Sequence, residues 1–437
     1  MIKRAFIGLT APRLEYDLVE PDPKKVPETI PIPPRLILLL NERLDSTKET
    51  LLKKGSMVKN GDRLFLYKDS TEYVLSPVNG TITSIGSYTG DLGIYSTYFI
   101  IEKDPLYDGK KGLTGFTSPV EIDPANRFLR ALPGSPPFNV FMNPDKKIQT
   151  IIITGTDEDL LSDTHQYFLA NHLDEIKQGI KILKQITGVD QIALTTPEKF
   201  KLPGEPEGLQ IFKISSLYPG AIPGMIIKDH LNKVIPAGGK PEDLGICFIS
   251  SEAVVSIARA YKGKKFIYDK LISVIDKDGT KTMVRATLGT PIHRIFKQLN
   301  ITASEKDRIV IGGPMKGLAS YTLYHPVLPD MDTIMIQDKK DISHVSDYPC
   351  INCGKCVKVC PAHIPVNLLV RFLEAGLYEE SADSYDLESC IECGLCAYVC
   401  TAEIPILQFI RLGRHELLKL RSDRQDSGRE EEEAANA

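Results

Sequence analysis

The period of hydrophobic and polar positions changes several times along this chain, and each change marks a region with its own predicted structure. Between residues 51 and 86, short apolar and β-branched runs alternate with glycine and Asn-Gly turns. Turns of this kind at this spacing are typical of β-hairpins. Upstream, residues 17–34 contain six prolines, which favours an extended strap over a helix or a central strand.

A strand–helix–strand pattern follows. Residues 147–155 (KIQTIIITG) predict a buried strand because of their β-branched run, and residues 190–196 (DQIALTT) predict another. Between them, residues 162–187 carry apolar side chains at helical spacing, with Ser162 and Asp163 as candidate caps. Two strands joined by one long helix predict a parallel sheet. The first strand is followed by TGTDED, which is not a GxGxxG dinucleotide loop.

The next third of the chain alternates again. The pattern predicts two strands around Asp278-Gly279, a helix that begins near Thr290, and a strand with a glycine-rich turn at 309–317 (IVIGGPMKG). Residues 366–386 then have a helical period. We therefore expect a multidomain α+β protein whose C-terminal part is helical.

Composition narrows the possible partners and location. The chain has 437 residues, 42% of them hydrophobic, and a formal net charge of −4. The terminal segment DSGREEEEAANA alone carries a net charge of −4, so the rest is nearly neutral and no nucleic-acid partner is predicted. No apolar run approaches the roughly 20 residues of a membrane span. We expect a cytoplasmic protein that does not insert into the membrane and whose acidic tail is disordered.

The chemistry concentrates in two cysteine runs between residues 350 and 400. Each has the spacing CxxCxxCxxxC, in which three thiolates converge on one cubic cluster and the fourth ligates the other cluster. We expect two [4Fe-4S] clusters, each with one ligand from the opposite run. The predicted ligands are Cys350, Cys353, Cys356 and Cys400 for cluster 1, and Cys390, Cys393, Cys396 and Cys360 for cluster 2.

The alternative for these cysteines is a pair of zinc sites. Zinc favours two CxxC pairs separated by a longer spacer, so the doubled pattern favours iron–sulfur clusters. Pro361 follows the first run, whereas Thr401 stands where proline usually follows the second. We expect a locally adjusted backbone there. The ninth cysteine, Cys247, lies in an apolar run and is predicted to be a buried small side chain.

With these motifs in hand, the chain resembles a known family, the C subunit of Rnf-type electron transport complexes. The resemblance covers about residues 5–415, and the cysteine runs PCINCGKCVKVCP and CIECGLCAYVC are its most specific pieces. GLTAPRLEY resembles the family's N-terminal strap, and SPVNG resembles a barrel-sandwich module. In that family, electrons pass from NADH through FMN and two clusters to membrane subunits, in some complexes in the reverse direction.

The resemblance implies an order of domains. They are an N-terminal strap and barrel-sandwich module at 1–115, an α/β domain similar to the FMN/NADH domain of the complex I flavoprotein at 116–245, a β-grasp domain of the soluble-ligand-binding (SLBB) type at 246–340, a helical two-cluster ferredoxin domain at 341–424, and a disordered acidic tail at 425–437.

The sequence departs from the family at the FMN loop. The family's loop has the glycine-rich pattern GxGGAxFPT, and the matching stretch here is RALPGSPPFNVF (130–141). Gly134 and Phe138 align with it, but Pro136 and Pro137 occupy glycine positions. Proline has no N–H and a fixed φ, so the loop loses donors that a phosphate needs. We expect a degenerate FMN/NADH site and assign no flavin ligand.

Two further family segments are altered. In TGTDEDL, Asp157 and Asp159 could stand in for the family's acids, but solvated acids in a helix-entry loop are the preferred interpretation. In residues 218–226 (YPGAIPGMI), the family's Glu-Lys pair is lost. Three loops are altered while the cluster ligands are intact. This combination predicts a subunit that keeps its electron-transfer clusters but receives electrons from a different donor.

Three functions follow as alternatives. The first is an electron-transfer subunit, held by other subunits at the inner face of the cell membrane, with NADH or an electron-donor protein as a possible donor. It is not expected to be a self-sufficient NADH dehydrogenase. The second is a soluble NADH-dependent flavin and iron–sulfur reductase, similar to the cobalamin reductases of propanediol utilisation. The third is a scaffold whose clusters only stabilise the fold, which two clusters in series argue against.

Overall fold

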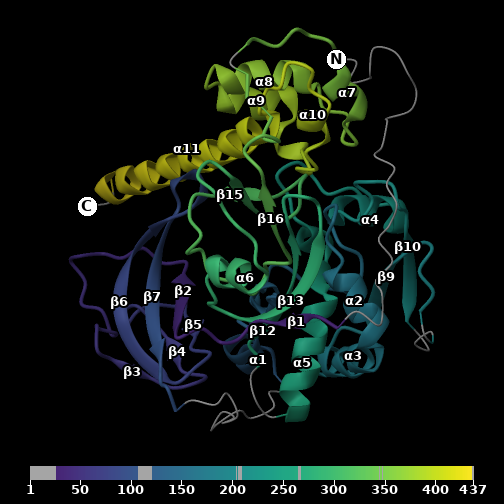
Figure 1. Cartoon of the computed structure of the whole chain (residues 1–437). Coiled ribbons are helices and arrows are strands. Elements are labelled where there is room, and N and C mark those ends of the chain that lie inside the picture. The colour runs from purple at the N-terminus through teal and green to yellow at the C-terminus, as the bar shows by residue number, and fades with distance from the viewer. Residues whose placement is uncertain are drawn as a thin grey trace.

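The computed structural model of the protein describes residues 26–106, 121–202, 204, 209–263, 267–343, 345–346 and 348–435, with side chains up to residue 424. The segment GLTAPRLEY and the first part of the predicted proline strap lie outside these residues. Three β-containing parts follow one another along the chain, and a helical part at the C-terminal end lies over them (Figure 1).

The first part is built from antiparallel strands. They form a sheet of order β2-β7-β6-β3 and a separate β4-β5 pair. The strands are β2 Arg35–Leu40, β3 Met57–Val58, β4 Arg63–Leu64, β5 Val74–Leu75, β6 Gly80–Thr89 and β7 Tyr95–Lys103. In β2 every second side chain, beginning with Leu36, points into the core of this part. The antiparallel pairing confirms the predicted hairpin-rich region, whereas the barrel-sandwich assignment stays a prediction.

The strap reaches a different sheet. Strand β1 Glu28–Thr29 pairs in parallel with β13 Lys281–Thr287, far along the chain. The extended segment before the first sheet therefore connects that sheet to the sheet that contains β13.

The second part is a parallel four-stranded sheet of order β10-β9-β8-β11. Its elements are α1 Ile122–Leu129, β8 Thr150–Thr154, α2 Thr164–Asn171, α3 Leu173–Thr187, β9 Gln191–Pro197, β10 Gln210–Ile214, α4 Pro223–Leu231, β11 Ile246–Ser250 and α5 Ser251–Gly263. The predicted strand–helix–strand unit is confirmed, but its helix is interrupted at His172, whose backbone leaves the helical region.

The boundary of this part differs from the prediction. Strand β11 begins at Ile246, after the expected end at residue 245, yet it pairs with β8 along its whole length. Helix α5 then packs against α3. The parallel sheet and its helices therefore extend to residue 263. The sequence did not predict this boundary, because an apolar run such as ICFIS does not reveal which sheet it joins.

The third part is a mixed six-stranded sheet of order β1-β13-β12-β16-β14-β15 with helix α6 Ile292–Gln298. Its remaining strands are β12 Asp269–Ile275, β14 Arg308–Ile311, β15 Leu318–Ser320 and β16 Thr333–Gln337. The predicted strands around Asp278-Gly279 and the helix after Thr290 are confirmed. The soluble-ligand-binding assignment of this part stays a prediction.

The C-terminal part is helical, as predicted. Its helices are α7 Lys355–Val359, α8 Val366–Glu374, α9 Tyr378–Tyr385, α10 Leu395–Tyr398 and α11 Ile406–Ala435. Helix α11 continues well beyond the others toward the C-terminus (Figure 1). The expected disorder at 425–437 is therefore not found over 425–435, which are helical. Glutamate and alanine are good helix formers and extend a helix that is already nucleated.

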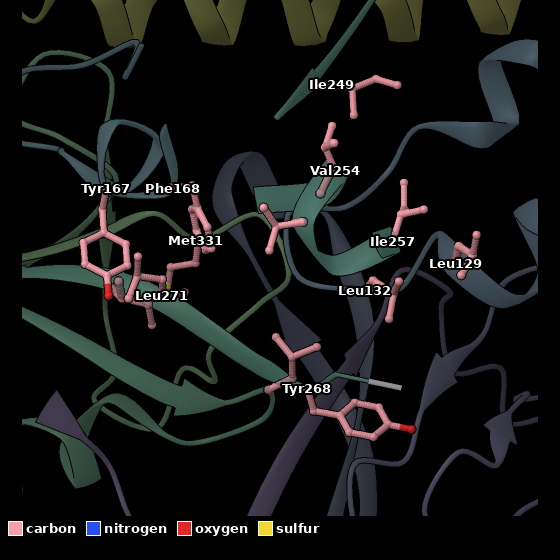
Figure 2. Close-up of a cluster of buried hydrophobic side chains, with 14 of the residues drawn as sticks. Leu129, Leu132, Tyr167, Phe168, Ile249, Val254, Ile257, Tyr268, Leu271 and Met331 are labelled. Carbon is pink, nitrogen blue, oxygen red and sulfur yellow. The ribbon is translucent and has the colours of Figure 1, made fainter. Parts of the chain in front are cut away.

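One hydrophobic core joins the parallel sheet to the six-stranded sheet. Val254 and Ile257 of α5 belong to the same buried cluster as Leu271 of β12 and Met331 (Figure 2). Burial of this shared apolar surface holds the two parts together.

A buried ion network lies in the same interface. The Lys270 side chain of β12 is fully buried and donates to Glu252 of α5 and, at 2.5 Å, to Asp332. Asp332 also contacts His165 of α2, with 3.1 Å between Oδ2 and Nε2. A charge without access to water requires such partners. The network therefore adds a polar connection to the apolar one between the two parts.

We expect Lys270→Met to lower the free energy of unfolding by about 3–5 kcal/mol, because the substitution leaves Glu252 buried without its cation. Lys53→Met is the control, since its partner Glu49 is exposed and such pairs contribute about 1 kcal/mol or less. Urea unfolding midpoints measure both variants. Equal shifts for the two would contradict a structural role for the network.

Candidate iron–sulfur centre

The two cysteine runs adopt the same local structure. Gly354 and Gly394 each precede a short helix and have left-handed backbones, with φ of 72° and 75°. Asn352 and Glu392, two residues after the first cysteine of each run, also share positive φ values of 57° and 52°. Glycine and asparagine tolerate this region better than most residues. The two runs are therefore structural twins forty residues apart.

The fourth cysteine of the second run lies with the first run. One small pocket is lined by the thiols of the first run and by Cys400, together with apolar side chains such as Ile404 and Val370. The thiols in this pocket are those of Cys350, Cys353, Cys356 and Cys400. Cys360, the last cysteine of the first run, does not line it. These four are the ligands predicted for cluster 1.

The second group of thiols is recognised by the electrostatic effect of its members on one another. Burial raises the pKa of Cys390 to about 12, and the neighbouring Cys360 thiol adds to the rise. Burial likewise raises the pKa of Cys393 to about 11, again with a contribution from Cys360. Cys396 has Cys390, Cys393 and Cys360 as neighbours, and also Cys356 of the first run. The structure thus brings together the four ligands predicted for cluster 2.

The donor chemistry fits iron–sulfur clusters. Burial raises the pKa of Cys356 to about 12, which disfavours its thiolate in the absence of a cation. Bound iron would supply the positive charge that stabilises several thiolates side by side. Within the ranges that the structure describes, no three His, Cys, Asp or Glu side chains are placed to hold a single metal ion.

Hydrogen bonds reach several of the sulfurs. The backbone N–H of Ile364 donates to Cys360 Sγ at 3.4 Å, and that of Glu392 donates to Cys390 Sγ at 3.3 Å. Thr401 Oγ1 lies 3.7 Å from Cys353 Sγ. Donors of this kind tune the reduction potential of a cluster. The sequence showed Thr401 only as a departure from proline, because its contact lies 48 residues away.

The two groups of thiols differ in exposure. Cys353 is exposed to solvent, whereas its twin Cys393 is buried. The Tyr218 hydroxyl donates to the Cys393 carbonyl at 2.6 Å, and Met315 packs in the same apolar cluster. The altered segment at 218–226 thus contacts the second run. We call the groups the outer and the inner centre, with Cys353 in the outer and Cys393 in the inner.

The inner centre is pressed against the glycine-rich turn at 312–317. A Cβ on Gly394 would lie 2.4 Å from the Met315 carbonyl oxygen, so only glycine allows this approach. Arg411 donates to the Lys316 carbonyl at 2.7 Å and to Glu392 at 3.1 Å. The turn predicted as a strand connection therefore also docks the helical part onto the six-stranded sheet.

A cavity of about 430 Å³ lies on the other side of this turn. Gly312, Gly313 and Lys316 line it, and so do Gly134 and His165. Burial by itself lowers the pKa of His165, but the Asp332 carboxylate outweighs that effect and raises the pKa to about 9. The carboxyl groups that line the cavity are those of Asp157, Glu158, Asp159, Asp330 and Asp332.

The expectation of solvated acids at 157 and 159 is wrong. Asp157 is buried and accepts hydrogen bonds from the Ser162 hydroxyl at 2.9 Å and the His165 N–H at 3.2 Å. Burial raises its pKa. Asp159 accepts the N–H of Lys316 at 2.6 Å, which ties the loop after β8 to the turn at 312–317. These partners lie far along the chain, where no local pattern reveals them.

In the loop that matches the family's FMN loop, the backbone N–H donors are hydrogen-bonded within the protein. The Gly134 N–H donates to the Pro329 carbonyl at 2.7 Å, and the Phe138 N–H donates to the Pro136 carbonyl at 2.9 Å. Pro136 and Pro137 have no N–H to offer. Phe138 itself is buried. Of these loop residues, only Gly134 lines the cavity. Cys247, as predicted, is buried, which raises its pKa to about 12.

Comparisons with known proteins agree with the cysteine chemistry. The model of a 4Fe-4S dicluster domain matches residues 349–404. The C subunit of the proton-translocating ferredoxin:NAD(+) oxidoreductase complex of Clostridium ljungdahlii is 26% identical over 82% of this chain and 83% of its own length.

Two other relatives match over smaller shares of their length. The C subunit of the Na(+)-translocating ferredoxin:NAD(+) oxidoreductase complex of Acetobacterium woodii is 22% identical over 61% of this chain and 59% of its own. The C subunit of the ion-translocating oxidoreductase complex of Pseudomonas aeruginosa is 24% identical over 76% of this chain and 46% of its own. The chain thus spans about half the length of these two. The predicted resemblance to such C subunits is confirmed.

We expect Gly394→Ala to destabilise the helical part more than Gly354→Ala does. Both positions require a left-handed backbone, which costs an alanine about 1–2 kcal/mol. Only at Gly394 does the added methyl collide with Met315, and overpacking costs about a further 1–3 kcal/mol. A Cβ on Gly354 meets nothing within 4 Å. Urea midpoints, with hydrogen exchange over 312–317, compare the pair, and equal effects would contradict the docking contact.

Proposed function

We propose that this chain, a homologue of the C subunits of ion-translocating ferredoxin:NAD oxidoreductases, is the iron–sulfur electron-transfer subunit of an Rnf-like complex. Bound at the two centres, [4Fe-4S] clusters would accept and release single electrons. The observation that carries the proposal is that Cys400 lines one pocket with thiols of the first run, while Cys360 is a neighbour of Cys390; both positions support an exchange of the fourth ligand. Shared ligation keeps two centres adjacent, as electron transfer in series requires.

The order of the two centres follows from their surroundings. The inner centre contacts the turn at 312–317, whose other side borders the cavity. The outer centre has its Cys353 thiol at the surface, in a loop that also exposes Tyr348 and Ile351. We therefore place the inner centre on the side of the cavity, and the outer centre where a partner protein can approach.

The lining of the cavity supports the proposal that the FMN/NADH site is degenerate. A phosphate needs several unpaired N–H donors and benefits from positive charge. Here the N–H groups of Gly134 and Phe138 are bonded within the protein, and Pro136 and Pro137 have none. Five carboxyl groups line the same cavity beside one lysine and one histidine, which disfavours an anionic nucleotide. The donor would then be a partner protein rather than a resident flavin.

The place of the subunit is part of the proposal. No helix in the described part of the chain is long and apolar enough to span a membrane. The relatives are named as subunits of ion-translocating complexes. We infer that the chain attaches to the inner face of the cell membrane through partner subunits, which also receive or supply its electrons.

We expect Cys360→Ser to damage the inner cluster and to leave the outer one intact. In the mirror variant, Cys400→Ser, the outer cluster should be lost first. Cys247→Ser is the control, since this thiol is buried away from both runs. Iron and sulfide analysis should give about eight irons per unmodified chain, and EPR of the reduced variants distinguishes the clusters. Loss of the outer cluster in Cys360→Ser would refute the crossed ligation, and stoichiometric zinc would refute the clusters.

We expect the anaerobically purified protein to hold little flavin and to oxidise no NADH by itself. Each charge-assisted bond to a phosphate contributes about 1.5–3 kcal/mol, so two missing donors weaken binding about 100- to 10,000-fold. Flavin released by heating and bleaching of the clusters by NADH are the measurements. Near-stoichiometric FMN with rapid bleaching would favour the alternative, an NADH-dependent flavin and iron–sulfur reductase.

A further inference from the structure

The twin cysteine runs differ at the residue that follows the last cysteine. It is Pro361 in the first run and Thr401 in the second. Because the fourth cysteine belongs to the opposite centre, Thr401 follows Cys400 in the outer centre. Its hydroxyl lies 3.7 Å from Cys353 Sγ, within hydrogen-bond distance for sulfur. Proline has no hydroxyl, so the corresponding position of the twin cannot make this contact.

The direction of this hydrogen bond is fixed by the chemistry of a cluster ligand. A coordinated cysteine is a thiolate, which has no proton to give. The Thr401 hydroxyl must then donate to Cys353 Sγ, since a hydroxyl can both donate and accept. Both residues are exposed at the surface of the helical part. The contact therefore lies at the solvent-facing edge of the outer centre.

A donor to a ligand sulfur stabilises the reduced cluster more than the oxidised one. Reduction adds one electron, and the added negative charge spreads onto the sulfurs and strengthens the bond from the hydroxyl. The reduction potential rises as a result. Solvent at Cys353 acts in the same direction, so the hydroxyl adds to an effect that the buried inner centre lacks.

We propose that Thr401 sets the reduction potential of the outer cluster by donating its hydroxyl to Cys353. The proposal rests on the proposed two-cluster function and names a positioning residue for it. Thr401 holds a proton donor at the sulfur of the most exposed ligand, and thereby makes the outer cluster easier to reduce than it would be without the hydroxyl. Its role is local, because the inner centre shares no ligand with this contact.

The test is a redox titration of matched variants, followed by EPR under anaerobic conditions. Thr401→Val keeps the shape of the side chain and removes the hydroxyl, so the midpoint potential of the outer cluster should become more negative. Thr401→Ser keeps the hydroxyl and should titrate like the unmodified protein. Thr401→Pro copies the twin and should shift in the same direction as Thr401→Val. The inner cluster should not move in any of them.

A second readout is independent of the potential. Loss of a hydrogen bond to a ligand sulfur strengthens the iron–sulfur bond, so the Fe–S(Cys) stretching frequencies in resonance Raman spectra should rise in Thr401→Val and not in Thr401→Ser. The outer cluster is identified by Cys353→Ser, which replaces one of its ligands by oxygen and leaves the inner cluster unchanged.

The outcomes separate this proposal from the proposed function. If each variant holds about eight irons and the outer potential is the same in Thr401→Val as in the unmodified protein, the role of Thr401 is refuted and the two-cluster function stands. The role is also refuted if both clusters shift equally, or if Thr401→Ser shifts as far as Thr401→Val. An unmodified protein without two clusters would refute the proposed function itself.

Discussion

The contact between the turn at 312–317 and the second cysteine run is the constraint on which the arrangement of this protein depends. The Met315 carbonyl approaches Gly394 so closely that no other residue fits, and Arg411 adds a hydrogen bond to the neighbouring Lys316 carbonyl. The same turn borders the cavity between the two sheets. One short loop therefore fixes the distance between the cavity and the inner centre.

The twin runs have been placed in different surroundings by this contact. The inner run is covered by Tyr218 and Met315, and its Glu392 is held by Arg411 and Arg414. Among the described residues, none covers Cys353 of the outer run in this way, and its side chain is exposed. Two copies of one motif thus acquire different solvent access, and solvent access is one of the factors that set cluster potentials. The difference arises from what packs against each run, not from the cysteine spacing, which is identical.

Many of these structural features could be predicted from the sequence, and most of the incorrect predictions share one cause. The cysteine spacing predicts which thiols form each centre, because two- and three-residue gaps restrict the local geometry, and the position of Cys400 beside the first run agrees with it. The contact of Asp159 with Lys316 could not be predicted, since the two residues are 157 positions apart. The same holds for β11, whose apolar run gives no sign that its partner is β8. The prediction of a disordered tail was wrong for a different reason. Its acidic composition is typical of disorder, but its glutamates and alanines also favour extension of an existing helix.

In the loop at 130–141, the backbone N–H groups of Gly134 and Phe138 are bonded within the protein. The Gly134 N–H bonds to Pro329, and the Phe138 N–H bonds back to Pro136. Both groups are thus satisfied without a ligand. Of the three positions between them, two are prolines without an N–H, and the Ser135 N–H bonds to the Leu132 carbonyl. Buried Phe138 still anchors the loop in the core shared by the two sheets. The thiols of the two centres differ from these N–H groups, because no backbone group can replace the thiolate that a cluster would need as a ligand.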